Sequence, residues 1–276
     1  MDINKADLIE GVAKGLSVLE SFDTERQRLN ATLAAQRTGL TRAAARRHLL
    51  TLAHLGYLET DGHHYWLSAK VLRFSGSYLA SARLPRAVQP TLNRLAAQTR
   101  ESFSVAVLDG DAVVIVARSV SALAPEGWRD WQSTSLGTPG LAVPPMRLMA
   151  YGLHLGARLP AHATSTGQVL LAALPVAQLN TWLKGRELTR LTPYTTVEHK
   201  AFKAQLAAVR KQDHCVASEA HELGVHAVAV PLRNMDGRTV GALNVVVSSQ
   251  RLRAGVFEQE LLPLLQGAAL EVRALL

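Results

Sequence analysis

"TGLTRAAARRHLLTLAHLGYL", from Thr38 to Leu58, predicts a tight turn followed by one helix with an excess of positive charge. Gly39 supplies the turn, Thr41 can cap the helix, and Gly56 ends it. Apolar residues recur at spacings of four and three, which places them on one buried face: Ala45, Leu49 and Leu52. The same geometry places the basic residues on another part of the helix surface: Arg42 and Arg46 share a face, and Arg47 lies next to it.

The basic residues of this helix belong to a longer block of one charge. From Arg26 to Leu58 the chain has six arginines and no Asp or Glu, whereas acidic residues lie on both sides of the block and balance the first 68 residues. A local basic patch on a nearly neutral module is typical of a protein that binds the phosphate backbone of nucleic acid.

Two further helices are predicted before this stretch, and a hairpin is predicted after it. The first helix carries four apolar residues at helical spacing: Val12, Leu16, Leu19 and Phe22. Asn30 can cap the second helix, which continues through Arg37. Two short strand-like runs flank Asp61-Gly62, a strong hairpin signal. Three helices and a hairpin in this order predict a winged helix-turn-helix, whose third helix enters the major groove of DNA.

The predicted DNA contacts come from the third helix and the hairpin: Thr41, Arg42, Ala43, Arg46, Arg47, His48, His63 and His64. Arginine can specify guanine through two hydrogen bonds, or it can bind phosphate and only position the protein. The pattern does not assign these two roles to individual arginines. A solvated basic helix face is the alternative interpretation, and His48 is either a DNA contact or a substitute for a core residue.

The remainder of the chain predicts a linker helix followed by an α+β domain. A helix over residues 70–83 ends at Pro85, and the following pattern alternates helices with antiparallel strands. The predicted helices cover residues 90–100, 164–174, 198–212 and 257–276. The predicted strands cover residues 102–108, 112–118, 146–156, 226–232 and 239–248. We therefore expect a DNA-binding domain over residues 1–68, a linker over 69–84 and a sensor domain over 85–276.

Composition limits the class of protein. The formal charge of +8 favours an anionic partner, and 48% hydrophobic residues are enough for a real core. Cys215 is the one cysteine, so the chain forms no internal disulfide and a reducing compartment is expected. The N-terminus lacks the pattern of a signal peptide, and no apolar stretch has the length of a membrane span. We expect a cytoplasmic protein that does not bind membranes.

The sequence resembles the IclR family of bacterial transcriptional regulators over almost its whole length. The stretches that carry the resemblance are "GLSVLESF" (15–22), the opening stretch (38–58), "SVAVLDG" (104–110), "GARLPAHATSTGQVLLAAL" (156–174), "GVHAVAVPL" (224–232) and "DGRTVGALNV" (236–245). The resemblance implies a winged helix-turn-helix, a linker helix and a C-terminal ligand-binding domain. It also implies dimers, or dimers of dimers, on palindromic operators, with RNA polymerase as a further candidate partner.

Within the family, the sequence is most similar to the branch that controls β-ketoadipate pathway genes. That similarity implies a small aromatic carboxylate as effector, such as 4-hydroxybenzoate or protocatechuate, or the non-aromatic β-ketoadipate. By resemblance, the effector site contains Tyr151, His162, Ser165, Thr166, Ala227, Asn244 and Val246. Ser165 and Thr166 begin a predicted helix, where free N–H groups favour a carboxylate. The alternative is that these hydroxyls only cap the helix.

The sequence departs from the family at three places. Ala31 and Ala34 replace larger aliphatic residues in the second helix, and His48 replaces an apolar residue in the third, so we expect a weaker small core. The largest departure is an insertion over about residues 122–145, which carries Trp128 and Trp131. We expect this insertion to be a lid on the ligand pocket, a subunit contact or a disordered bulge.

Two other classes of protein are weaker alternatives. An enzyme is disfavoured, because Ser165 is not in a nucleophile elbow and no base can be assigned to Cys215 from the sequence. A metal-responsive regulator is suggested by His214, Cys215, His221 and His226, but their spacing matches no strong zinc pattern. We therefore expect neither a metal nor another cofactor.

Overall fold

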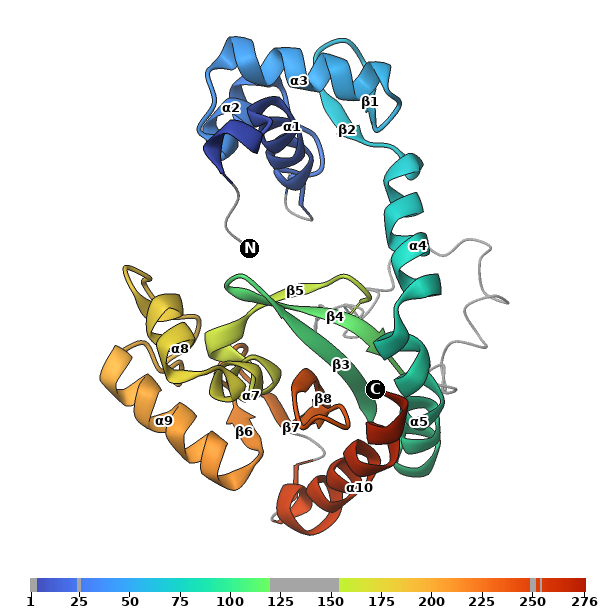
Figure 1. The fold of residues 1–276 in the computed structure, drawn as a ribbon, viewed down its shortest axis with the longest axis vertical. Helices are drawn as coiled ribbons and strands as arrows, with labels where there is room; N and C mark the ends of the chain where they lie inside the picture. Colours follow the sequence, from blue (N-terminus) through green and yellow to red (C-terminus); the bar gives the residue numbers. More distant parts are fainter. Residues whose placement is uncertain (1–3, 24–25, 120–153, 249–251, 254) are drawn as a thin grey trace, which may run out of the picture. The chain divides into compact units, whose positions relative to one another are not determined.

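The computed structural model of the chain describes residues 4–23, 26–119, 154–248, 252–253 and 255–276. It divides into two compact units, Met1–Ala80 and Ser81–Leu276 (Figure 1). The finer division into residues 1–68, 69–84 and 85–276 stays a prediction.

The first unit is the predicted winged helix-turn-helix. After a short 3-10 helix at Lys5–Asp7 it contains α1 (Glu10–Glu20), α2 (Ala31–Thr38) and α3 (Arg42–His54), then the antiparallel hairpin of β1 (Leu58–Thr60) and β2 (Tyr65–Leu67). The predicted caps are confirmed: Asn30 accepts the amides of Thr32 and Leu33, and Thr41 accepts the amide of Ala44 at 3.2 Å. Gly39 has φ +69°, the left-handed conformation that the turn requires.

The predicted apolar face of α1 is only partly correct. Val18 and Phe22 are buried with Ala45 and Leu49 of α3, whereas Val12 and Leu16 are 57% and 53% exposed. Helical spacing places these residues along one side of the helix, but the small core reaches only the C-terminal half of α1. Ala34 is fully buried, so a small residue does occupy this core position.

The predicted helix over 70–83 differs from the structure at its C-terminal end. A 3-10 turn at Ala69–Val71 leads into α4 (Leu72–Ser81), and α5 (Arg83–Thr99) begins after an extended Ala82. Pro85 therefore lies in the first turn of a helix, where a missing N–H costs nothing, rather than ending one. The prediction that a helix begins at Pro90 is also wrong, because Pro90 lies inside α5.

The second unit is built on an antiparallel sheet with strand order β5-β4-β3-β8-β7-β6. The strands are β3 (Ser102–Asp109), β4 (Ala112–Arg118), β5 (Arg158–Pro160), β6 (Cys215–Ser218), β7 (Val225–Arg233) and β8 (Thr239–Ser248). The helices α7 (Ser165–Ala173), α8 (Val176–Leu183) and α9 (His199–Gln212) cover one face of the sheet (Figure 1). The other face is covered by α5 and α10 (Leu262–Val272), which lies between a π-helix at Val256–Leu261 and a 3-10 turn at Arg273–Leu275.

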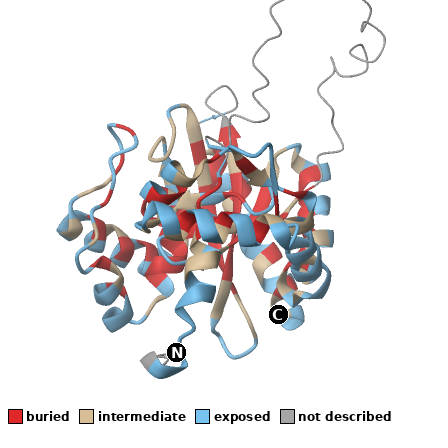
Figure 2. Ribbon diagram, turned by 90° about the horizontal axis from the view of Figure 1, so that it is seen from above, coloured by how far each residue is buried: buried red, intermediate tan, exposed pale blue. Residues whose placement is uncertain are grey.

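Large and small residues alternate along the strands of this sheet, so they lie on opposite faces. The large apolar residues Val228, Leu243 and Val245 pack under α5 and α10, whereas the small Ala229 and Ala242 lie under α7, α8 and α9. Figure 2 shows the buried residues concentrated in the strands and in the helix faces that cover them. Because side chains on the α7 face are small, this side of the sheet has room for a cavity.

Several predicted elements of the second unit need correction. Residues 146–153 of the predicted strand 146–156 lie outside the described residues, residues 154–156 form a turn, and the strand found here is β5 at Arg158–Pro160. The short elements β6 and α8 were missed. The insertion over 122–145, with Trp128 and Trp131, also lies outside the described residues.

Candidate DNA-binding surface and effector pocket

A groove in the first unit lies between α3, the start of α2 and the hairpin. Its lining residues come from these three elements: Asn30, Ala31, Thr32, Arg42, Arg46, Gly62, His63, His64 and Tyr65. The structure thus brings four of the predicted DNA contacts, Arg42, Arg46, His63 and His64, to one surface.

The arginines of α3 differ from Arg28 and Arg37 of the same unit in their partners. Arg37 forms an ion pair with Asp23, and Arg28 stacks on Trp66 at 4.3 Å from the ring centroid. By contrast, Arg42, Arg46 and Arg47 are exposed, and no ion pair or hydrogen bond of their side chains is found within the described residues. Their guanidinium groups therefore remain available to phosphates or bases.

The turn of the hairpin is held by Asp61. Its carboxylate accepts the amide N–H groups of His63 and His64 at 2.9 and 2.7 Å, and these hydrogen bonds lower the pKa of Asp61. The hydroxyl of Thr60 donates to the carbonyl of His64 at 2.8 Å. The backbone of both histidines is therefore fixed, with the His63 side chain exposed and that of His64 half-buried.

The other predicted DNA contacts have different surroundings. The hydroxyl of Thr41 caps α3, and Ala43 is exposed. His48 is half-buried, and a Cβ built on Gly15 of α1 would lie 3.7 Å from its Nδ1. This position between helices favours packing over DNA contact for His48.

The second unit contains a cavity of about 60 Å³ between the sheet, the start of α7 and the segment that joins β6 to β7. Five of the predicted effector residues line it: Ser165, Thr166, Ala227, Asn244 and Val246. Tyr151 lies outside the described residues. His162 lines a separate cavity with Trp182 and Arg186, and its Nε2 lies 2.9 Å from the carbonyl oxygen of Thr189, so its place in the effector site is not supported.

The N-terminus of α7 forms the polar end of this cavity. The Thr164 hydroxyl accepts the amide of Gly167, which leaves the amides of Ser165 and Thr166 without an intrahelical acceptor. Ser165 is 2% exposed, and its Oγ has no hydrogen-bond partner among the described residues. A buried hydroxyl without a partner is costly, so a ligand atom that supplies one is favoured here.

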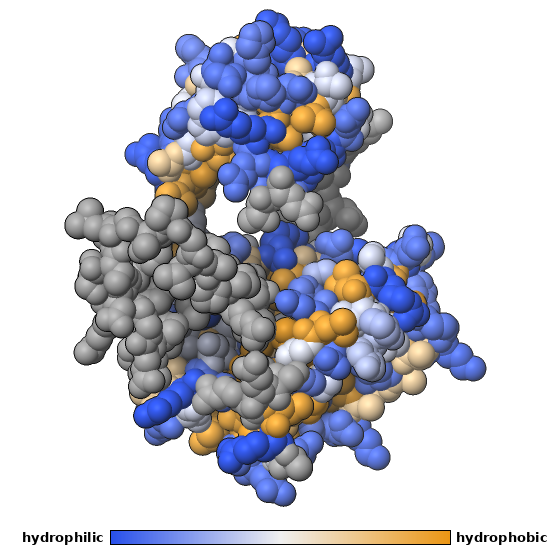
Figure 3. All heavy atoms as spheres, turned by 180° about the vertical axis from the view of Figure 1, so that it is seen from behind, coloured by the Kyte–Doolittle hydropathy of each residue, from blue (hydrophilic) through white to orange (hydrophobic). Residues whose placement is uncertain are grey.

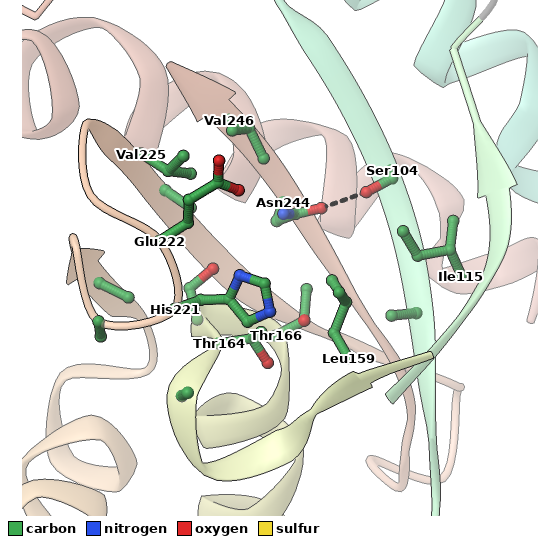
Figure 4. A pocket seen from close by; sticks show the side chains of 16 residues that line it. Ser104, Ile115, Leu159, Thr164, Thr166, His221, Glu222, Val225, Asn244 and Val246 are labelled. Carbon is green, nitrogen blue, oxygen red and sulfur yellow. Dashed lines mark hydrogen bonds between the residues drawn. The ribbon is translucent and has the colours of Figure 1, made fainter. Parts of the chain in front are cut away.

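Two residues of the sheet, Ser104 and Asn244, form a pair in the cavity wall. The sequence resemblance assigns Asn244 to the effector site but does not identify Ser104. Ser104 of β3 and Asn244 of β8 lie opposite each other, and the Ser104 hydroxyl donates to Oδ1 of Asn244 at 2.6 Å (Figure 4). Both residues are buried. The strand register brings them together, and that register cannot be seen in one sequence.

The segment between β6 and β7 supplies two titratable side chains, His221 and Glu222. Figure 4 shows them entering the cavity from this segment, with Asn244, Ser104 and Ile115 across from them. Burial lowers the pKa of His221, and the neighbouring Glu222 opposes that shift. His221 is therefore mainly neutral at neutral pH.

Cys215 and the histidines near it bear on the two alternative functions, an enzyme and a metal-responsive regulator. Burial raises the pKa of the Cys215 thiol to about 12, and its Sγ donates to Oε1 of Gln168. Such a thiol is not a nucleophile at neutral pH. The described residues contain no group of three or more His, Cys, Asp or Glu that could hold a metal ion. No helix in the described part of the chain is long and apolar enough to cross a membrane.

Both units of the structure correspond to domains of known proteins. Residues 11–62 match the IclR helix-turn-helix domain, and residues 142–274 match the bacterial transcriptional regulator IclR C-terminal domain. Two curated relatives from Acinetobacter baylyi are each 47% identical over 99% of this chain. They are the Pca operon regulatory protein, covered over 91% of its length, and the p-hydroxybenzoate hydroxylase transcriptional activator, covered over 94%.

A solved structure extends the comparison to the second unit. It is a double mutant of the inducer-binding domain of the PobR transcription factor from Acinetobacter, in complex with 3-hydroxybenzoic acid. It is 42% identical to this chain with a TM-score of 0.58, and the match covers 70% of this chain and 98% of that structure. The chain belongs to the IclR family of bacterial transcriptional regulators, which are DNA-binding proteins rather than enzymes.

Proposed function

We propose that this protein regulates genes of aromatic-acid catabolism in response to a small aromatic carboxylate, with 4-hydroxybenzoate or a close analogue as effector. The observation that carries this proposal is the buried Ser165 hydroxyl at the N-terminus of α7, for which the described residues supply no hydrogen-bond partner. Helix N-termini favour anions, and the adjoining apolar wall suits a ring. The relatives that regulate pca genes and p-hydroxybenzoate hydroxylase support the same effector class.

DNA binding through α3 and the hairpin is the second part of the proposal. Arg42, Arg46 and Arg47 extend from α3, and their side chains have no partner in the described part of the chain. His63 and His64 line the same groove as Arg42 and Arg46. We assign the third helix to the major groove and the hairpin to the neighbouring backbone. Thr41 and Ala43 contribute at the start of the helix.

A homodimer on a palindromic operator completes the proposal, because a palindrome presents the same half-site twice. Exposed apolar residues of α1 support a contact between two copies: Ile9, Val12 and Leu16 fall on one side of the helix and are 70%, 57% and 53% exposed. On the face shown in Figure 3, apolar patches interrupt a surface that is otherwise largely hydrophilic. We also propose a cytoplasmic location, a dimer of dimers as the larger assembly and RNA polymerase as a partner at the promoter.

Calorimetric titration of the full-length protein tests the effector assignment. We expect heat of binding with 4-hydroxybenzoate or protocatechuate, and affinity about tenfold lower in Ser165→Ala, because one hydrogen bond to a carboxylate is lost. Thr181→Ala, which removes a hydroxyl from the exposed surface of α8, is the control. No heat with either aromatic acid would contradict the effector class and leave the DNA-binding assignment standing.

A further inference from the structure

We infer that Glu222 selects the effector by accepting a hydrogen bond from a ring hydroxyl and excluding ligands with a second carboxylate. This inference rests on the proposed function and narrows it. It distinguishes a hydroxylated aromatic acid, with one negative charge, from a dicarboxylate such as β-ketoadipate.

The charge of the cavity wall is the first observation. Among the described residues that line the cavity, there is no Lys or Arg, and Glu222 is the one acid. The helix N-terminus in the described part of the wall is that of α7, where Ser165 and Thr166 can bind an anion. A ligand with one carboxylate uses that feature, whereas a second carboxylate would meet no cation and would share the cavity with Glu222.

The unused hydrogen-bonding capacity of Glu222 is the second observation. No described residue donates a hydrogen bond to the Glu222 carboxylate or forms an ion pair with it. By contrast, its neighbours Glu219, Ala220 and Gly224 all take part in hydrogen bonds. An ionised carboxylate only accepts hydrogen bonds. The group that completes this site is therefore a donor such as a phenolic hydroxyl, which forms strong, short hydrogen bonds to carboxylates.

The segment that carries Glu222 is fixed from both sides, which is the third observation. The buried hydroxyls of Thr192 and Thr195 donate to the carbonyls of Glu219 and Ala220, each at 2.7 Å. The carboxylate of Glu219 accepts the amide of Gly224 at 2.8 Å, which closes the segment on itself. The acceptor at Glu222 thus has a set backbone position before a ligand enters, and a preorganised acceptor discriminates better than a mobile one.

A set of matched ligands tests this selection by calorimetry on the full-length protein. The ligands are benzoate, 3-hydroxybenzoate, 4-hydroxybenzoate and terephthalate, which share one ring and one carboxylate and differ in the second substituent. We expect the better hydroxybenzoate to bind about ten- to hundredfold more tightly than benzoate, as one charged hydrogen bond predicts, and terephthalate to bind at least about tenfold more weakly than benzoate.

Glu222→Gln is the variant, because it keeps the shape of the side chain and removes its charge. We expect the preference for hydroxybenzoate over benzoate to fall by about five- to tenfold, and terephthalate to gain affinity, since an amide can donate to a carboxylate. A variant that fails to fold cannot produce a gain. Glu258→Gln is the control, because it removes the same charge from an exposed position outside the cavity lining.

Two results would overturn the inference alone: wild-type protein that binds terephthalate as tightly as benzoate, or unchanged ligand ratios in Glu222→Gln. If folded, operator-binding protein binds none of the four ligands, the proposed aromatic effector fails together with the inference.

Discussion

At Gly167, α7 lies close against the backbone of the chain that precedes it. A Cβ built at Gly167 would lie 2.1 Å from the carbonyl oxygen of Ala161, which is backbone and cannot move aside as a side chain would. The missing side chain therefore allows the N-terminus of α7, with Ser165 and Thr166, to sit where it forms the end of the cavity.

Gly167→Ala is expected to destabilise the second unit by about 1–3 kcal/mol or more, because forced overpacking displaces backbone. Gly267→Ala in α10, where a Cβ would meet nothing within 4 Å, is the matched control and should leave stability unchanged or raise it. Urea unfolding measures both. Equal stabilities for the two variants would contradict the close approach at Gly167.

His221 gives the second unit a dependence on pH. Its pKa is lowered from 6.5, chiefly by burial, so the unfolded chain takes up a proton before the folded protein does as pH falls. The unfolding free energy therefore falls as the pH decreases from 6.5 towards the pKa that His221 has in the folded protein. We expect the unfolding free energy of His221→Gln to fall less over that interval. Urea unfolding of both proteins above and below pH 6.5 measures this, and parallel losses would contradict it.

At the scale of elements, α3 is the part of the molecule that sequence describes best. Its cap, its buried face and its end at Gly56 depend on local spacing, and all are found where they were predicted. Arg46→Ala and Arg47→Ala should each weaken operator binding, by about 1–3 kcal/mol where the arginine contacts a base. Arg73→Ala, which removes an exposed arginine from α4, is the control.

Fluorescence anisotropy with operator DNA, located by footprinting beside the gene, measures these affinities. Replacing an arginine that contacts phosphate should also reduce the salt dependence of binding, whereas replacing one that contacts a base should relax the sequence preference. Normal operator binding by both Arg46→Ala and Arg47→Ala would show that α3 is not the recognition helix.

Other elements could not be predicted, for reasons that are physical. The spacing of Val12 and Leu16 predicts that both lie on one face of α1. It does not show how far along that face the core of the first unit extends. Strands as short as β5 and β6 carry too few residues to show a period of two. The sequence does not show whether Pro85 ends a helix or lies in the first turn of one, because proline suits both positions.

The candidate sites show the same limit. Ser165, Thr166 and Asn244 are assigned to an effector site by resemblance to a family, and in the structure all three line the cavity of the second unit. Glu222 and Ser104 were missed, because strand register and the path of the segment between β6 and β7 bring them to the cavity. The place of Thr192 and Thr195 beneath that segment is likewise a property of tertiary structure rather than of local sequence.

At the scale of the whole molecule, the exposed apolar side of α1 bears on assembly. Replacing Val12 and Leu16 together by Ser should convert the proposed dimer to a monomer and weaken operator binding, while the unfolding free energy of the monomer stays nearly unchanged, since both side chains are exposed. Sedimentation velocity measures the change in mass. Val176→Ser, at an exposed apolar position of α8, is the control, and an unchanged mass for the double variant would contradict this interface.

We expect a carboxylate bound at the N-terminus of α7 to change transcription from the promoter that the protein occupies. Transcription in vitro from the promoter beside the gene, with RNA polymerase and with or without 4-hydroxybenzoate, measures this change. Ligand should change the transcript yield with wild-type protein, and Ser165→Ala should bind the operator normally but need more ligand for the same change. Transcript yield that is the same with and without saturating ligand, on DNA occupied by wild-type protein, would show that the ligand does not control transcription through this protein.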